Sequence, residues 1–426
     1  MNGIEVGTLV RKNGQLSFTY AAHWMALEGS RALSLSLPMQ SMPIKGAKVE
    51  AYFDNLLPDN PKICEHIADL LGAGSSKPFD LLGTIGKDCV GAISLGTEPP
   101  TGDIAPLSLK EVAEADIEQT LKDTRFNNTL GMKQDEDFRI SLAGAQEKTA
   151  LTLWADKWYK PQGQTATTHI FKPPILHHEQ MNIDLSSSVD NEWFCMRFLH
   201  YMDMDIAQAD IMQFGSQKVL VVERFDRKIV PNNIVRLPQE DMCQALGVFS
   251  GAKYEDKGGP GAQAIMDLLA TSVNPTEDRY TFMKAQLIFW LLAAIDGHAK
   301  NYSIFLTANG FKMTPLYDVI SAYPYFGQGN IQAKKIKMAM KVHGKNSHYH
   351  WDNIMLRHWS SNAKHLRFDP QFMEKIISQV NAQAMDALDL AFADKNALFD
   401  TRVGEAIAEG VTKALKRLQP TPPSRG

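Results

Sequence analysis

The stretch Ile295-Asp296-Gly297-His298-Ala299-Lys300-Asn301 lies between two apolar segments with different periodicities. The preceding run, residues 285–294, is almost continuously apolar and predicts a buried helix, whereas residues 302–306 alternate as a β-strand does. A second aspartate, Asp318, follows at the end of another strand-like run. The sequence therefore predicts a polar loop between a buried helix and a strand, with a further carboxylate in a later loop.

Asp296, Asn301 and Asp318 are the residue types of a phosphoryl-transfer centre. In protein kinases, one aspartate accepts the proton of the substrate hydroxyl, while an asparagine and a second aspartate hold Mg²⁺ against the ATP phosphates. Mg²⁺ prefers oxygen ligands, and the proton-accepting aspartate must stay free of the metal. Taken alone, the stretch is better explained as a helix end followed by an Asp-Gly turn. Other parts of the chain favour the phosphoryl-transfer centre over the simple turn.

Composition describes an ordinary globular protein. The chain has 426 residues, 44% of them hydrophobic and 22% charged, which predicts two or three lobes. A net charge of −4 indicates no overall attraction to nucleic acid or membrane. No signal peptide or bilayer-spanning run is apparent, so we expect a cytoplasmic protein without a membrane partner. Four cysteines lack paired metal-ligand spacing, which makes zinc unlikely and buried thiols the simplest interpretation: Cys64, Cys89, Cys195 and Cys243.

The N-terminal part predicts a small accessory α+β subdomain over residues 1–100. Asn13-Gly14 between alternating runs is a strong hairpin signal. Helices are expected around residues 51–57 and 61–71, and a strand over residues 88–95. Beyond a linker near residues 98–102, we expect a kinase-like N-lobe with a phosphate loop over residues 101–235. A helical C-lobe over residues 236–420 and a disordered tail over residues 421–426 complete the predicted organisation.

A stretch of small residues, 139–149, follows an acidic helix expected near residues 108–123. Small residues allow backbone N–H groups to approach phosphates. The stretch matches neither the Walker pattern nor the glycine loop of kinases, and alone it indicates a tight turn. However, Lys172 ends the next predicted strand, which is the order of elements in kinases. Glu192, in the first turn of a helix that begins near Ser186–Ser188, either pairs with Lys172 or favours the helix N-terminus electrostatically.

Several longer motifs are similar to the HipA toxins of bacterial HipBA toxin–antitoxin modules. They cover nearly the whole chain in the same order: residues 33–38, 53–59, 140–150, 222–227, 236–244, 296–301 and 317–321. The resemblance implies an α+β, two-lobed, atypical protein-kinase-like fold with an N-terminal accessory subdomain. It implies a growth-arresting, persistence-linked Ser/Thr protein kinase that uses ATP and Mg²⁺. It also implies a HipB-like helix-turn-helix antitoxin as partner, operator DNA bound as a co-repressor through the complex, and a protein substrate. The best-known target in the family is glutamyl-tRNA synthetase.

The resemblance also implies roles for individual residues. Asp296 would be the catalytic base, Asn301 and Asp318 the Mg²⁺ ligands, and Ser141 a self-inhibiting autophosphorylation site. Lys364 and Arg367 would contact DNA. The nucleotide contacts would be Ala143, Gly144, Ala145, Gln146, Glu147, Lys148, Lys172, Glu223, Arg224, Phe225, His298, Ala299, Lys300, Asn301, Tyr317 and Asp318.

Two alternatives remain open at this point. One is a small-molecule kinase on the same core, and the other is a catalytically silent co-repressor that only supports an antitoxin on DNA. The presence of Lys172, Asp296, Asn301 and Asp318 argues against the silent co-repressor, because such a protein is free to lose them. Any DNA contact is expected to need a partner, since Lys364 and Arg367 form only a small patch to which Lys334, Lys335 and Lys337 add weakly.

Overall fold

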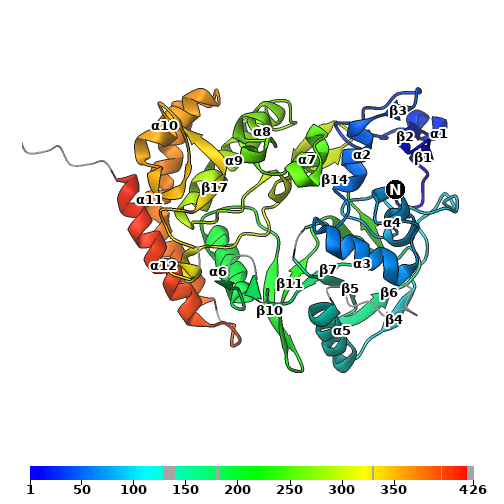
Figure 1. Cartoon of the computed structure of the whole chain (residues 1–426), viewed down its shortest axis with the longest axis horizontal. Helices are drawn as coiled ribbons and strands as arrows, with labels where there is room; N and C mark the ends of the chain where they lie inside the picture. Colours follow the sequence, from blue (N-terminus) through cyan, green and yellow to red (C-terminus); the bar gives the residue numbers. More distant parts are fainter. Residues whose placement is uncertain are drawn as a thin grey trace, which may run out of the picture. The chain divides into compact units, whose positions relative to one another are not determined.

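The computed structural model describes residues 1–127, 140–144, 146–175, 177–178, 183–328, 331–394 and 396–419. The chain forms two compact units (Figure 1). The first comprises residues 1–173, 212–253 and 303–313, and the second comprises residues 174–211, 254–302 and 314–426. The predictions for Ala145 and for the tail after residue 420 lie outside the described residues. The predicted boundaries at residues 100 and 235 stay predictions.

The first unit opens with the predicted hairpin. Strands β1 (Gly7–Lys12) and β2 (Gln15–Tyr20) pair antiparallel, and β3 (Ile44–Lys45) adds a third strand. Asn13 and Gly14 have φ angles of 53° and 78°, so both turn residues are left-handed. A two-residue turn with this backbone matches the twist of the flanking strands, which is why Asn-Gly is favoured there.

Four helices complete this N-terminal region: α1 (Ala22–Ala26), α2 (Ala47–Asp54), α3 (Pro61–Leu71) and α4 (Pro78–Ile85). Helix α3 is delimited as its sequence predicts. The Asn60 side chain accepts the Lys62 N–H at 3.0 Å, and Gly72 ends the helix in a left-handed conformation. Buried apolar side chains of these helices and of β2 share one core.

The prediction of a strand over residues 88–95 is wrong. Only Asp88 makes a β-bridge there, with Ile140, and Gly91 turns the chain with a φ of 73°. Instead, Asp88 faces a cluster of arginines while Cys89 and Ile93 enter the core. Two different sets of partners therefore hold this segment, which has no place in a sheet.

The largest sheet among the described residues has six strands, in the order β10-β11-β7-β5-β6-β4. Ile117 and Leu121 of helix α5 (Glu114–Asn127) pack against apolar side chains of this sheet, including Phe171. The acidic helix predicted over residues 108–123 therefore begins later than expected, because β4 occupies its first residues. The strands are β4 (Leu109–Glu111), β5 (Thr149–Trp154), β6 (Lys157–Pro161), β7 (His169–Lys172), β10 (Ala209–Phe214) and β11 (Gln217–Glu223).

The rest of the first unit consists of a hairpin and a small sheet. Strands β12 (Arg227–Val230) and β13 (Asn233–Arg236) form the hairpin. The sheet has the order β14-β15-β16. A capping box between Asp241 and Gln244 starts the helix that follows β14. These elements are β14 (Gln239–Asp241), α7 (Met242–Leu246), β15 (Ser303–Thr307) and β16 (Gly310–Met313).

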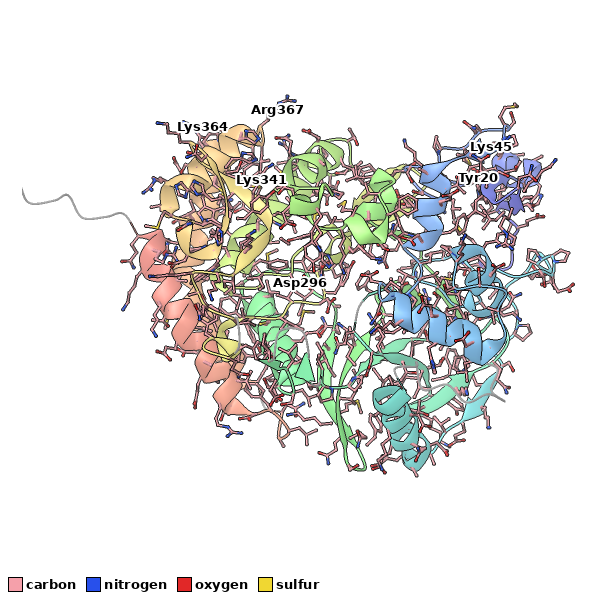
Figure 2. The ribbon with its side chains drawn as sticks, in the orientation of Figure 1. Tyr20, Lys45, Asp296, Lys341, Lys364 and Arg367 are labelled. Carbon is pink, nitrogen blue, oxygen red and sulfur yellow. The ribbon has the colours of Figure 1, made fainter. Side chains whose placement is uncertain are left out.

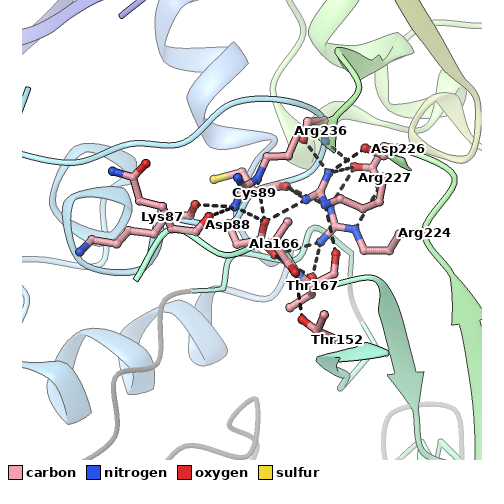
Figure 3. A network of polar contacts seen from close by, with 12 residues as sticks. Lys87, Asp88, Cys89, Thr152, Ala166, Thr167, Arg224, Asp226, Arg227 and Arg236 are labelled. Atoms are coloured by element: carbon pink, nitrogen blue, oxygen red, sulfur yellow. Dashed lines mark hydrogen bonds and ion pairs between the residues drawn. The ribbon is translucent and has the colours of Figure 1, made fainter. Parts of the chain in front are cut away.

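A buried ionic network joins distant segments of the first unit (Figure 3). Asp88 accepts hydrogen bonds from Arg227 and Arg236, each at 3.0 Å. Arg224 and Arg227 each approach Asp226 to 2.9 Å. Burial alone would raise the pKa of Asp88, but the three guanidinium groups hold it well below its ordinary value. The network ties residue 88 to the strands around residue 227.

Glu240, on β14, is a second buried charge-bearing group, but it has no cation beside it in the described residues. Its side chain is fully buried and accepts the Leu35 N–H at 2.9 Å. Burial raises the pKa of this carboxyl to about 8. We therefore expect it to be neutral in the folded protein at neutral pH.

This raised pKa makes stability depend on pH. Between the ordinary pKa of a glutamate and about 8, the folded state keeps a proton that the unfolded state has lost. The free energy of unfolding should thus fall by roughly 1.4 kcal/mol per pH unit as pH rises through this window. Glu240→Gln should remove that slope in urea titrations at pH 5.5, 7 and 8.5. Exposed Glu374→Gln is the matched control, and an unchanged slope in Glu240→Gln would contradict the burial argument.

The second unit is mainly helical. Helix α9 (Pro275–Leu291) is buried along most of its length, and α6 (Ser188–Tyr201) packs against α11. Helix α6 begins where predicted, although the side chain of its first flanking residue, Ser187, makes no capping hydrogen bond. The other elements are β8 (His177–His178), β9 (Ile183–Asp184), α8 (Ala262–Leu269), β17 (Lys337–His343), β18 (Ser347–His350), α10 (Leu356–His365), α11 (Pro370–Ala393) and α12 (Thr401–Leu415). Among the described residues, none of the helices combines the length and apolar character needed to cross a membrane.

Candidate functional site

The loop that carries Asp296 is fixed at its base by the buried helix α9. After this helix ends at Leu291, the chain turns through Ala293, whose φ is 48°. The Ser321 hydroxyl donates to the Leu292 carbonyl at 2.6 Å, and the Ala339 N–H donates to the Ile295 carbonyl at 3.0 Å. The buried helix thus supports a short loop whose backbone is held from both sides.

Asp296 itself, labelled in Figure 2, is exposed. Its carboxylate Oδ1 accepts a hydrogen bond from the Tyr254 hydroxyl at 2.5 Å. The next residue has to be small, because a Cβ on Gly297 would lie 2.6 Å from the Phe289 ring. An exposed carboxylate on a rigid loop is chemically suited to accept a proton from an incoming hydroxyl.

Asn301 and Asp318 lie side by side in the second unit. The Asn301 Nδ2 atom is 3.3 Å from the Asp318 carbonyl oxygen and 3.4 Å from its carboxylate Oδ2. Asp318 has a φ of 60°, a left-handed conformation that is uncommon for a residue with a Cβ. Backbone strain of this kind is found preferentially at functional sites. The structure therefore brings together two of the three residues on which the sequence prediction depends.

The pair offers oxygen ligands of the kind that Mg²⁺ prefers. Within the described part of the chain, the buried Asn301 Oδ1 atom has no hydrogen-bond donor. A buried amide oxygen without a donor is costly unless something else satisfies it. The amide oxygen of Asn301 and the carboxylate of the neighbouring Asp318 are both ligands that a hard divalent cation accepts. The chemistry of the two side chains is thus compatible with the predicted metal role.

The other predicted nucleotide contacts in this unit surround the pair. His298, Ala299 and Lys300 are buried, and Ala299–Asn301 forms a 3₁₀ turn. The Tyr317 hydroxyl donates to the Lys300 carbonyl at 2.8 Å, which links the segment before Asp318 to the turn. These contacts hold the two polar segments together. Direct nucleotide contacts by these residues remain predictions.

In the first unit, the small-residue stretch is held by the loop between helices α2 and α3. The Ser141 hydroxyl is fully buried and donates to the Leu56 carbonyl at 2.7 Å. The Asp59 N–H donates to the Gly144 carbonyl at 3.0 Å. Gly144 has a φ of 112°, and a Cβ there would lie 2.5 Å from the Lys148 Nζ atom. Only glycine suits this position, as expected for a loop that keeps its backbone accessible.

Two of the remaining predicted nucleotide contacts of this unit donate hydrogen bonds to backbone carbonyls, and a third is buried at the end of a strand. Lys148 donates to the Ala143 carbonyl at 2.6 Å, and Gln146 donates to the Pro173 carbonyl at 3.0 Å. Lys172 is buried at the end of β7, as predicted, and pairs in register with Leu220. Glu147 precedes Lys148 in the same loop and is only partly exposed. The pairing of Glu192 with Lys172 remains a prediction.

Among the predicted nucleotide contacts at residues 223–225, one side chain is already engaged in other contacts. The Arg224 guanidinium donates to Asp226 at 3.0 and 2.9 Å and to Thr167 at 2.9 Å, all within the buried network (Figure 3). Any nucleotide contact of Arg224 is thereby restricted to its main chain. Glu223 is exposed and Phe225 is partly exposed.

Lys364 and Arg367, the predicted DNA contacts, are both exposed at the end of α10, and their side chains point outward in Figure 2. Arg279 of α9 fixes this turn by donating to the carbonyls of Leu366 at 3.0 Å and of Arg367 at 2.6 Å. Arg367 adopts a left-handed φ of 50°. The two cations are therefore presented by an ordered turn.

Sequence reasoning missed Tyr254. This residue lies 42 positions before the carboxylate that it contacts, in a loop whose only local signal is its glycine content. It also missed Leu56 and Asp59 as partners of the small-residue loop, although the motif that contains them was singled out. Long-range contacts of this kind leave no periodic signal in a single sequence.

Two family models match the chain. The model of the HipA-like C-terminal domain matches residues 140–388, and that of the HipA N-terminal domain matches residues 1–96. The protein Y4mE of Sinorhizobium fredii is 33% identical over 342 residues, which cover 78% of this chain and 76% of Y4mE. The serine/threonine-protein kinase toxin HipA of Shewanella oneidensis is 30% identical over 335 residues, which cover 73% of each chain.

A solved structure resembles the whole chain. A chain in the Shewanella oneidensis complex of HipA, HipB and operator DNA has a TM-score of 0.78 and 25% identity. The similarity covers 97% of this chain and 94% of that chain. It confirms the predicted α+β fold class.

Proposed function

We propose, from the premise that this chain belongs to the HipA family, that it is an ATP-dependent protein kinase and the toxin of a toxin–antitoxin module. The observation that carries the proposal is the contact between Asn301 and Asp318. Among the described residues, the buried amide oxygen of Asn301 has no hydrogen-bond donor. A hydroxyl-bearing protein side chain is the proposed acceptor. Mg-ATP is the proposed phosphoryl donor.

In this proposal, each polar residue has a separate task. Asp296 accepts the proton of the acceptor hydroxyl, which its exposure on a rigid loop permits. Asn301 and Asp318 would hold Mg²⁺, which when bound neutralises charge on the phosphates. The backbone around Gly144 would approach the phosphates. Lys172 and Lys148 would supply positive charge to them.

The experiment that tests the proposal is incubation of the purified chain with Mg-ATP, followed by intact-mass and peptide mass spectrometry. We expect phosphate on at least one serine or threonine of the chain. The silent co-repressor alternative predicts no added phosphate, and a small-molecule kinase predicts ATP turnover only with an added small acceptor. Absence of phosphate with a correctly folded, ATP-binding sample would reject the proposal.

Asp318→Ala should weaken Mg²⁺-dependent nucleotide binding in addition to transfer, because it removes the anionic member of the proposed metal pair. We expect calorimetric titration to show a loss of Mg-ATP affinity, with a smaller effect on ATP measured in excess chelator. Asp386→Ala, an exposed substitution on α11, is the control. Equal Mg-ATP affinity in wild type and Asp318→Ala would reject the metal role.

We further propose that phosphorylation of Ser141 switches the protein off. The hydroxyl is fully buried against the Leu56 carbonyl, and the Ser141 N–H donates to the Asp88 carbonyl at 3.0 Å. A phosphate adds roughly −1.5 to −2 charges and cannot remain beside a carbonyl oxygen in this buried position. The segment would have to leave, and the contacts of Gly144 would be lost with it.

Ser141→Asp and wild-type protein phosphorylated at Ser141 should both lose Mg-ATP binding in calorimetric titrations. Ser141→Ala, which keeps the size of the site, should retain binding, although its transfer rate can fall through altered local packing. Ser361→Asp, at an exposed position of α10, controls for added charge. Unchanged Mg-ATP affinity of the phosphorylated, nucleotide-free protein would show that the switch does not exist.

The proposed partners are a HipB-like antitoxin and, through it, operator DNA. The structure of the Shewanella oneidensis relative was determined in a complex with HipB and operator DNA. Lys364 and Arg367 are two exposed cations on a chain of net charge −4, so DNA binding by the isolated chain should be weak and steeply salt-dependent. The proposed phosphate acceptor is a protein, and glutamyl-tRNA synthetase is the first candidate.

A further inference from the structure

We propose that Tyr254 is a positioning residue for phosphoryl transfer, acting through the carboxylate of Asp296. The proposal rests on the proposed kinase function. The Tyr254 hydroxyl donates to Asp296 Oδ1 at 2.5 Å, which leaves Oδ2 to accept the proton of the acceptor hydroxyl. Tyr254 does not itself touch the reacting atoms in this scheme.

The carboxylate needs such a restraint because it is exposed. The loop fixes the backbone of Asp296, but its side chain extends into solvent, where several rotamers are accessible. Among the described residues, Tyr254 is the side chain that hydrogen-bonds this carboxylate. A misplacement of about 1 Å in a reacting group can cost roughly 100-fold in rate, so one fixed hydrogen bond has a large effect.

Tyr254 is itself held in place. Its ring meets the His298 ring edge-on with centroids 5.0 Å apart, and the Lys257 Nζ atom lies 5.3 Å from its centroid. Its carbonyl accepts the N–H groups of Lys257 at 3.1 Å and Gly259 at 3.0 Å. The phenol is thus aimed at Asp296 by ring contacts and by a closed turn.

The residue after Tyr254 anchors this turn to a strand. The Glu255 carboxylate accepts the Lys341 N–H at 2.8 Å and lies 3.1 Å from the Lys341 Nζ atom. A Cβ on Gly261 would lie 2.1 Å from the Glu255 carboxyl, so a glycine is needed for the anchor to form. Gly261 therefore allows close packing against the residue that follows the fixed tyrosine.

The test is Tyr254→Phe, which keeps the ring and removes the hydroxyl. We expect the maximal rate of self-phosphorylation at saturating Mg-ATP to fall by about 10- to 100-fold. The Mg-ATP concentration at half-maximal rate should stay within about twofold, since Tyr254 has no role in nucleotide binding here. Tyr201→Phe is the matched control, because that hydroxyl donates to Asp394 at 2.8 Å in the same unit.

Two further measurements separate positioning from other roles. In an Asp296→Ala background, Tyr254→Phe should cause no additional loss, because the hydroxyl acts only through that carboxylate. An unchanged or increased rate in Tyr254→Phe would overturn the inference, as would phosphate on Tyr254 itself, which would make it an acceptor. If wild-type protein transfers no phosphate, the proposed function fails first, and the inference fails with it.

Discussion

Replacing Asp296 by Ala is expected to lower the rate of phosphoryl transfer by about 100- to 10,000-fold, the usual contribution of a positioned general base. The side chain is exposed, so its removal leaves no cavity and no unsatisfied partner in the core. We expect the same unfolding midpoint as wild type and the same Mg-ATP affinity. A pure rate effect of this kind is measured by following phosphate incorporation at saturating Mg-ATP.

The control for this variant is Asp386→Ala, which removes an exposed carboxylate from α11. It should transfer phosphate at the wild-type rate. If Asp296→Ala retains most of the wild-type rate, Asp296 is not the base. If it also loses Mg-ATP binding, its role is in nucleotide binding and the division of tasks between Asp296 and Asp318 is wrong.

Asp88→Asn is expected to have the largest effect on stability. Asp88 shares a buried site with three arginines, and its only anionic companion among the described residues there is Asp226. The substitution keeps the shape but leaves the guanidinium groups without one of their two counter-charges. Removing one partner from a buried ion network typically costs on the order of 3–5 kcal/mol. Urea or thermal unfolding would measure the loss.

A surface ion pair of the same unit provides the comparison. Asp80 lies 2.8 Å from Arg11, which is well exposed to solvent. Asp80→Asn should therefore cost less than about 1 kcal/mol. Equal losses for the two variants would mean that the network in Figure 3 does not stabilise the fold beyond an ordinary surface contact.

What the sequence predicts well is what depends on neighbours along the chain. Asn13-Gly14 specifies a turn by backbone preference, and Asn60 and Gly72 delimit α3 by capping. The polar loop around Asp296 is predictable for the same reason, because a buried helix and a strand flank it. Read with the rest of the chain, the residue types also indicate that Asn301 and Asp318 belong together, and the Asn301 Nδ2 atom lies 3.4 Å from the Asp318 carboxylate.

What the sequence does not predict depends on partners far along the chain. The sequence predicts a strand over residues 88–95, yet Asp88 is oriented by arginines more than 130 positions away. The Arg224 side chain is taken up by the same network, which a motif match cannot reveal. Tyr254 reaches Asp296 only through the tertiary fold. In each case, the deciding interaction has no local periodicity.

The central claim is that Asn301 and Asp318 form the metal-binding part of a Mg-ATP site. A crystal structure of the chain with Mg²⁺ and a non-hydrolysable ATP analogue tests it most directly. We expect Mg²⁺ bound by Asn301 Oδ1 and an Asp318 carboxylate oxygen at about 2.0–2.1 Å, with Asp296 free of metal. A nucleotide bound away from both residues, or a Mg²⁺ ion ligated by Asp296 in their place, would contradict the account.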